Sequence, residues 1–212
     1  GRGHLTLADV FQESSALLVG SAFLLSLLIG SFLNVVIHRL PIMLDRQWRA
    51  QAREMLTAPD SPAPPTEREP AEERYNLIVP RSACPHCGAP ILAHQNIPVI
   101  SWLLLGGKCA SCKAKISPRY PIVELATAIL SAAVVWQFGF HWQSVAALFL
   151  TWALVALTVI DLDHQILPDV ITLPLLWLGL LASLAWHAGL APPIPTDPRS
   201  AVLGAVAGYL TL

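Results

Sequence analysis

The chain has 212 residues, of which 54% are hydrophobic and only 13% are charged, and its formal net charge is −1. Soluble domains carry about 25% charged residues, so this composition excludes an ordinary soluble globular protein. A net charge near zero gives no general attraction to phosphate backbones, so we expect no nucleic-acid partner. The composition instead predicts a protein that lies in a lipid bilayer.

The first uncharged segment, residues 14–37, predicts transmembrane span 1. A helix rises about 1.5 Å per residue and crosses a ~30 Å hydrocarbon core in about 20 residues, which this segment exceeds. A cleaved signal peptide is the alternative, but the apolar run is long and the basic pair His38 and Arg39 follows it. Residues 1–13 are predicted to be a periplasmic segment.

The second half of span 1 contains the small residues Gly30 and Ser31 and the polar residue Asn34. Small residues let helices approach closely, and a buried asparagine finds hydrogen-bond partners across a helix interface. We therefore expect this face to pack against other spans. A role for Asn34 in an active site is the alternative.

Residues 38–121 are predicted to form a cytoplasmic domain. Eleven of the 13 lysines and arginines lie between Arg39 and Arg119, several of them close to span ends, where basic residues mark the cytoplasmic side. Pro41 is expected to end the first span, and residues 44–56 to form a short charged helix. Residues 57–73 are rich in proline, alanine and glutamate and are expected to be a linker.

The most specific motif is a pair of Cys-x-x-Cys turns made by Cys84, Cys87, Cys109 and Cys112. Two such turns can present four thiolates to one tetrahedral zinc ion, and in a reducing compartment metal binding is favoured over disulfides. His86 or His94 could replace a thiolate, but four cysteines already complete a closed structural site. Free or redox-active cysteines are the alternative. We expect the zinc to stabilise the fold and to perform no chemistry.

Residues 122–212 are predicted to contain spans 2 to 4 and the start of span 5. The expected spans cover residues 122–140, residues 143–160, residues 169–187 and residues from about 200 onward. With residues 38–121 in the cytoplasm, span 3 returns the chain to the cytoplasmic face at Asp161.

Acidic side chains gather where span 3 ends, at Asp161, Asp163 and Asp169, with His164 between them. Ionisable groups near hydrocarbon are costly, so such a cluster indicates a functional site. A plain exit of the helix into water is the alternative. Proton transport would place acids within several spans, and neighbouring residues on a helix point in different directions, which disfavours a metal site. Asp169, after Pro168, is expected to cap the next helix.

Of the functions that an acidic cluster at a membrane face suggests, hydrolysis by aspartates remains, and it needs two carboxylates. Two neighbouring carboxylates share one proton, so that one activates water while the other protonates the carbonyl or leaving group. Asp161 is the candidate for one of them. Glu124, Asp163 and Asp169 are the possible second acids in this chain, and none is convincing on its position in the sequence.

The chain resembles the type IV prepilin peptidases, membrane aspartyl proteases that also N-methylate their products. The resemblance covers nearly the whole chain and is carried by residues 30–41, both cysteine pairs, residues 96–98, Ser101, residues 106–109, residues 119–125 and residues 160–169. It implies that Asp161 is the first catalytic aspartate. The family's second aspartate lies in a later Gly-x-Gly-Asp motif, which this chain lacks and which we expect just beyond Leu212.

The resemblance implies an all-α polytopic membrane protein with a small cytoplasmic zinc-ribbon-like insertion, located in the bacterial inner membrane. The full protein would remove the leader of type IV prepilins and pseudopilins and methylate the new N-terminus with S-adenosylmethionine, whose binding residues the sequence does not identify. The 212-residue chain alone is expected to be inactive as a protease. A non-catalytic zinc-containing membrane scaffold of a pilus or secretion assembly is the alternative function.

Overall fold

The computed structural model describes residues 11, 13–56, 75–92, 97–189 and 197–211, and within them it is helical. The named helices are α2 (Ser15–Leu56), α3 (Ile100–Leu104), α4 (Arg119–Phe138), α5 (Trp142–His164), α6 (Asp169–His187) and α7 (Pro198–Thr211). The described residues contain isolated β-bridges but no strand. Four helices, α2, α4, α5 and α6, are long and apolar enough to cross a membrane. These observations confirm the all-helical membrane fold.

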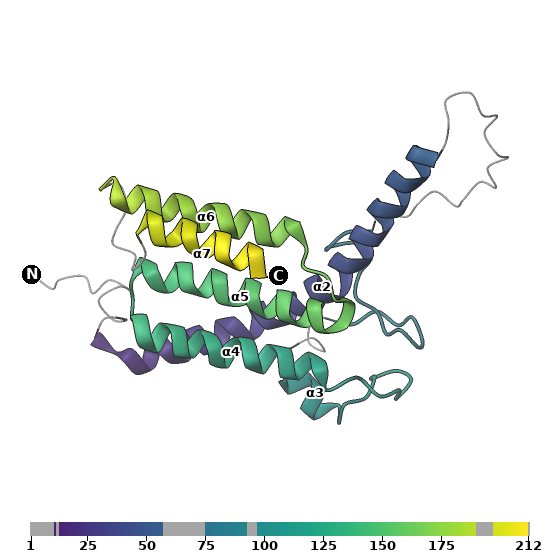
Figure 1. Cartoon of the computed structure of the whole chain (residues 1–212). Helices are drawn as coiled ribbons and strands as arrows, with labels where there is room; N and C mark the ends of the chain where they lie inside the picture. The colour runs from purple at the N-terminus through teal and green to yellow at the C-terminus, as the bar shows by residue number, and fades with distance from the viewer. Residues whose placement is uncertain (1–10, 12, 57–74, 93–96, 190–196, 212) are drawn as a thin grey trace, which may run out of the picture.

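Helix α2 corrects the expectation that Pro41 ends the first helix and that residues 44–56 form another. The 42-residue helix α2 runs through Pro41 without a break. A proline inside a helix removes one backbone hydrogen bond. The turn around it is held by burial, because Ile37 is 4% exposed and Leu40 is 9% exposed. Figure 1 shows the first part of α2 against the bundle and its last part projecting beyond it.

Helices α2 and α4 lie very close together where Gly30 passes Glu124. A Cβ atom on Gly30 would lie 2.6 Å from the Glu124 Cα atom. Four residues further along α2, the Asn34 side-chain amide donates a hydrogen bond of 3.0 Å to the Tyr120 carbonyl of α4. Asn34 is 9% exposed. This contact supports the packing interpretation of Gly30 and Asn34.

A single apolar cluster joins helices α2, α4 and α5. Its buried members are Leu33, Ile37, Leu40, Val123, Ala156 and Ile160. Ile160 is fully buried and immediately precedes Asp161, so the cluster anchors the helix up to the residue before this aspartate.

A second, smaller difference from the predicted spans lies at the end of α5. Helix α5 continues to His164, so Asp161 and Asp163 lie in its last turn and not beyond it. Gln165 follows in the left-handed conformation with φ 53°, and its N–H donates to the Asp161 carbonyl at 2.8 Å. A left-handed residue of this kind is a common way to end a helix. Helix α6 has the predicted bounds, Asp169–His187.

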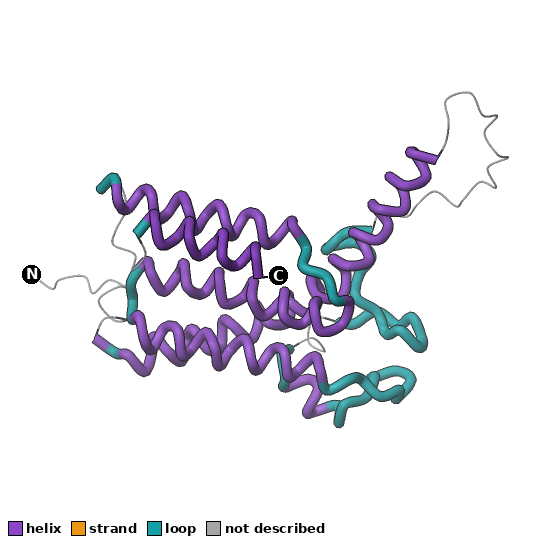
Figure 2. The backbone as a smooth tube through the Cα atoms, viewed as in Figure 1, coloured by secondary structure: helices purple, strands orange, loops and turns teal. Residues whose placement is uncertain are grey.

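The helices place the candidate residues at one end of the bundle. The end of α5, the start of α6 and the loops that carry the cysteines lie at the same end, on the right of Figure 1. The longer described loops lie there, while the short α4–α5 turn lies at the opposite end (Figure 2). The predicted linker at residues 57–73 lies outside the described residues.

Candidate functional site

The two cysteine pairs are built on one repeated backbone pattern. In the first turn, the Cys84 N–H donates to the Ala89 carbonyl and the Gly88 N–H donates to the Cys84 carbonyl, each at 2.9 Å. The second turn repeats both hydrogen bonds 25 residues later, at positions 109, 113 and 114. The antiparallel bridge Ala83 to Pro90 recurs with the same offset, between residues 108 and 115. The two cysteine turns therefore have the same backbone structure.

Each turn needs a left-handed residue after its second cysteine. Gly88 has φ 69° and Lys113 has φ 59°. Glycine adopts this region freely, whereas a lysine there is uncommon. The repeated turn geometry therefore forces the lysine into a conformation that its side chain disfavours.

The four cysteine sulfur atoms meet in one cluster that could hold a metal ion. The Sγ atoms of Cys84, Cys87, Cys109 and Cys112 all lie within 4.8 Å of one another. The Cys84 and Cys112 sulfurs are 3.8 Å apart, which matches the spacing of about 3.8 Å expected for thiolates at 2.3 Å from a tetrahedral zinc ion. The donor set and spacing fit zinc.

The backbone favours the thiolate form at one of these cysteines. N–H groups of Cys112 and Ser111 donate to the Cys109 sulfur and lower its pKa to about 6. The Cys109 residue is 8% exposed, and Cys84 is equally buried. Of the two histidines considered as substitute ligands, His86 is outside the cluster and His94 lies outside the described residues.

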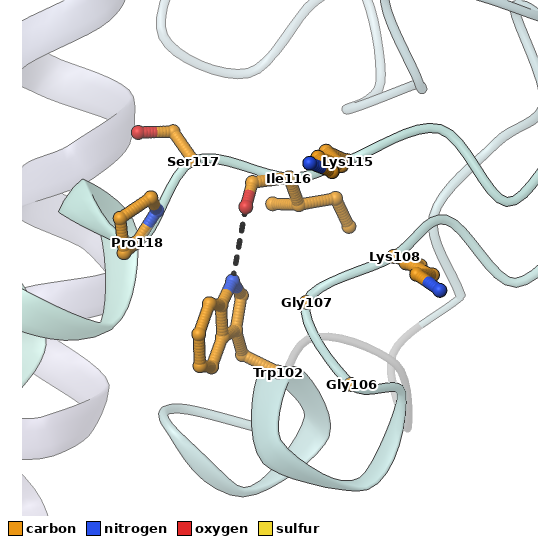
Figure 3. A pocket seen from close by; sticks show the side chains of 8 residues that line it. All are labelled: Trp102, Gly106, Gly107, Lys108, Lys115, Ile116, Ser117 and Pro118. Atoms are coloured by element: carbon orange, nitrogen blue, oxygen red, sulfur yellow. Dashed lines mark hydrogen bonds between the residues drawn. The ribbon is translucent and has the colours of Figure 1, made fainter.

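A groove of about 450 Å³ lies beside the second cysteine turn (Figure 3). Its lining residues are Trp102, Gly106, Gly107, Lys108, Lys115, Ile116, Ser117 and Pro118. The Trp102 indole N–H donates to the Ile116 carbonyl at 3.2 Å, as Figure 3 shows. A Cβ on Gly107 would lie 2.9 Å from the Trp102 ring, so the indole requires a glycine there. The groove lies between the part of the chain around α3 and the segment that leads into α4.

Arg39 anchors the chain before the first cysteine turn to helix α2. Its guanidinium donates to the Asn76 carbonyl at 2.8 Å and to the Pro80 carbonyl at 2.6 Å, and it lies 5.7 Å from the centre of the Tyr75 ring. Arg39 is only 7% exposed. This residue, expected only as a basic residue after the span, fixes residues 75–80 against the bundle.

Glu124 anchors the segment between the two cysteine turns. Its carboxylate accepts a hydrogen bond of 2.7 Å from the Val99 N–H, and the Ser31 hydroxyl of α2 is a second partner. Glu124 is 7% exposed, and Val99 has the unusual φ of 59°. Among the described contacts, none joins Glu124 to Asp161. Glu124 therefore has a structural role, which is to hold Val99 against α4.

Asp161 lies in the last turn of α5 with an exposed side chain. Asp163, two residues later, forms an ion pair with Arg119 at the start of α4. Residues two apart on a helix are separated by a rotation of about 200° around the helix axis, so their side chains leave nearly opposite faces. Asp163 is turned to α4, and Asp161 therefore points in another direction. The structure leaves Asp161 accessible and pairs Asp163 with a cation.

Asp169 does not cap helix α6 as predicted. The N-cap residue is Pro168, and no side chain makes a capping hydrogen bond there. Asp169 is instead the first residue of the helix, where a carboxylate still interacts favourably with the positive end of the helix dipole. The expectation of a cap was wrong because the helix begins one residue earlier than a cap at Asp169 would require.

Sequence reasoning missed the partners of Arg39, Glu124 and Arg119. In the sequence, each of them is a charged residue at or near the end of an apolar run. This pattern predicts that the residue lies near a membrane face, but it does not predict which residue it contacts. Apart from Ser31, which is further still from Glu124, their partners lie 25 to 44 residues away along the chain, and only the packing of the helices brings them together.

Comparison with known proteins identifies the family. Residues 24–138 match the family described as bacterial Peptidase A24 N-terminal domain, and residues 148–212 match the type IV leader peptidase family. No solved structure matches the chain.

Several relatives carry the name prepilin leader peptidase/N-methyltransferase. The protein of Pseudomonas aeruginosa is 52% identical over 98% of this chain and 67% of its own length. That of Stutzerimonas stutzeri is 51% identical over the same shares, and that of Aeromonas salmonicida is 56% identical over 90% of this chain and 61% of its own length. The chain thus spans about two thirds of these relatives. These matches confirm the resemblance, and the chain belongs to the type IV leader peptidase family of membrane enzymes.

Proposed function

We propose that the whole protein removes the leader of type IV prepilins and pseudopilins and then N-methylates the new N-terminus. The observation that carries the proposal is Asp161, an accessible carboxylate in the last turn of a membrane helix, in a chain whose relatives are named prepilin leader peptidase/N-methyltransferase. An exposed acid at this position can meet a substrate whose apolar helix stays in the bilayer while its leader lies in water.

Asp161 would act as one of two carboxylates. One ionised carboxylate takes a proton from water as the water attacks the scissile carbonyl, and the protonated partner gives a proton to the carbonyl oxygen or leaving amine. Asp163 is paired with Arg119 and Glu124 is bonded to the Val99 N–H, so neither is free to share a proton with Asp161. We assign the second carboxylate to the family's Gly-x-Gly-Asp motif.

The course of helix α7 supports this assignment. The helix starts at the end of the bundle opposite Asp161 and runs toward the end where Asp161 lies (Figure 1). A residue that follows this helix can therefore come close to Asp161. The 212-residue chain itself has no Gly-x-Gly-Asp motif, and we propose that it does not cleave prepilins alone.

The cysteine module and Asp161 would face the cytoplasm of a bacterial inner membrane. Both lie at one end of the bundle, next to the segment that holds most of the lysines and arginines, and such residues near span ends mark the cytoplasmic side. A zinc ion held by Cys84, Cys87, Cys109 and Cys112 would stabilise the module, because four thiolates leave no open position for water or substrate. S-adenosylmethionine would supply the methyl group, and we assign it no binding residues.

The test is cleavage of a prepilin in liposomes by the protein extended through its native C-terminus, with Asp161→Asn as the key variant. We expect this variant to lose at least about 10²-fold in kcat, since it removes an acid–base group. Asp45→Asn is the matched control, because Asp45 is an exposed acid on the projecting part of α2 whose side chain pairs with Arg49. Normal cleavage by Asp161→Asn would remove Asp161 from the mechanism.

The same assay tests the second carboxylate and the alternative function. The 212-residue chain and the extended protein are compared side by side, and we expect cleavage only from the extended protein. Cleavage by the shorter chain would mean that the second acid lies within it. Absence of both leader cleavage and methylation in the extended protein would instead favour a non-catalytic scaffold.

A further inference from the structure

Among the described side chains, one ion pair connects the exposed end of helix α5 directly to helix α4. Residues 161–165 are all exposed, and Leu162 is 77% exposed, so the turn that carries Asp161 has no apolar cover of its own. Within the described part of the chain, the pair between Asp163 and Arg119 is the only side-chain hydrogen bond or ion pair made by these five residues. The buried cluster includes Ile160 just before this turn, and Ile166, just after the turn, packs against the same cluster.

Arg119 is well placed to hold this turn. It is the first residue of α4, and its backbone N–H donates a hydrogen bond of 3.3 Å to the Ser117 hydroxyl oxygen. The segment just before it is fixed, because the Ile116 N–H donates to the Gly107 carbonyl at 2.8 Å and the Ile116 carbonyl accepts from Trp102. The guanidinium therefore extends from a rigid junction between the cysteine module and α4.

We propose that the Arg119–Asp163 ion pair is a positioning element that fixes the direction of the Asp161 side chain. This role rests on the proposed peptidase function. Asp161 and Asp163 are separated by a rotation of about 200° around the helix axis. Holding Asp163 against α4 therefore sets the rotation of the last turn and with it the direction of Asp161. Neither Arg119 nor Asp163 touches the substrate in this role.

The pair is suited to position a group without stabilising the fold. Its side chains are 42% and 30% exposed, and exposed ion pairs contribute little to stability. A displacement of about 1 Å at a reacting group, in contrast, can lower a rate about 10²-fold. Loss of the pair should therefore slow catalysis while the fold is retained.

The experiment uses the extended protein in liposomes and the variants Arg119→Gln, Asp163→Asn and the exchanged pair Arg119→Asp with Asp163→Arg. We expect each single variant to lower kcat for leader cleavage about three- to fivefold, because an exposed pair can shift the population of the correctly placed turn by no more than about this factor, with KM within about 1.5-fold of the unmodified protein. The exchanged pair should recover most of the rate. It suits both helix ends, since an acid at the start of α4 and a cation at the end of α5 match the helix dipoles.

Two controls separate positioning from a folding defect. Arg49→Gln breaks another exposed arginine–aspartate pair, Arg49 with Asp45, and should leave kcat unchanged. Methylation of a pilin that is already cleaved breaks no peptide bond, and the proposal gives Asp161 no part in it, so the single variants should methylate this pilin at the rate of the unmodified protein. A variant that failed to fold would lose both reactions.

Several outcomes would overturn the proposal. These are single variants with an unchanged kcat, an exchanged pair no more active than the single variants, and a loss that appears only as a higher KM, which would place Arg119 in substrate binding. If the unmodified extended protein cleaves nothing, the proposed peptidase function itself is wrong, and the role of the pair is overturned with it.

Discussion

At the residue scale, a few polar side chains fasten the cysteine module to the membrane helices. Arg39 of α2 holds the carbonyls of Asn76 and Pro80, and Glu124 of α4 holds the Val99 N–H. Both side chains are less than a tenth exposed. Hydrogen bonds to buried charged groups are stronger than neutral ones, so these two residues connect parts of the chain that share little apolar contact.

Replacing Arg39 should loosen the segment before the first cysteine turn. Arg39→Ala removes two charge-assisted hydrogen bonds, a loss of about 1.5–3 kcal/mol each. We expect hydrogen exchange in residues 75–83 to become at least about tenfold faster, because about 1.4 kcal/mol corresponds to a factor of ten. The Ile78 and Val79 amides, each bonded at 2.8 Å to the Asn76 side chain, should respond most.

Arg46→Ala is the matched control for this prediction. Arg46 lies 4.5 Å from the centre of the same Tyr75 ring, and its only recorded contact in the described structure is with that ring. An exposed cation–π contact contributes about 0.5–1 kcal/mol, so exchange should change far less than in Arg39→Ala. Equal rates of amide hydrogen exchange in residues 75–83 of the two variants would show that the Arg39 hydrogen bonds do not hold this segment.

At the element scale, the contact between α2 and α4 decides how the bundle is assembled. Gly30 lets the two backbones approach, and Asn34 then reaches the Tyr120 carbonyl one turn further on. The same contact brings Ser31 to Glu124. Close approach at a small residue is a common source of helix association in membranes, where the hydrophobic effect does not drive helices together.

Gly30→Ala should weaken this helix pair. The new Cβ would meet the Glu124 Cα atom at 2.6 Å, and backbone atoms cannot rotate away as a flexible side chain can. Overpacking of this kind costs about 1–3 kcal/mol, which denaturant unfolding in detergent micelles would measure.

Gly20→Ala is the control on the same helix. A Cβ there meets nothing within 4 Å, so this variant should be neutral or slightly stabilising, as alanine favours helix more than glycine does. A Gly30→Ala variant as stable as Gly20→Ala would contradict the close contact.

At the scale of the whole molecule, the chain combines a helical membrane bundle with a module held by its cysteines. The module has few buried apolar side chains, since among the described residues between 75 and 118 these are Cys84, Pro98 and Cys109. A segment without an apolar core depends on other constraints, and a metal ion supplies one. The bundle has its own buried cluster and does not share that dependence.

Loss of the metal should therefore unfold the module and leave the helices intact. Cys109→Ser should reduce the zinc content from about one ion per chain to a small fraction of that, because a closed site needs all four ligands. Proteolysis should become faster within residues 75–118, while helical circular dichroism changes little. Ser111→Ala, an exposed position between two of the cysteines, should retain the metal. Full zinc content in Cys109→Ser would exclude the four-cysteine site.

The sequence by itself determined which parts of this protein enter the membrane and where a metal could bind. Spans are set by the length of apolar runs and the cysteine turns by short-range spacing, so the bounds of α6 and the clustering of the four cysteines agree with prediction. Asp161 was singled out because an acid that follows an uncharged run is unusual.

The tertiary structure alone decided how these parts are joined. The passage of α2 through Pro41, the pairing of Arg119 with Asp163 and the bond from Val99 to Glu124 all depend on residues distant in the sequence. Apolar spacing fixes that a helix forms, but not its rotation or its neighbour, and these determine which charged side chains meet. A buried neighbour can also outweigh the local cost of a proline, as it does at Ile37 and Leu40.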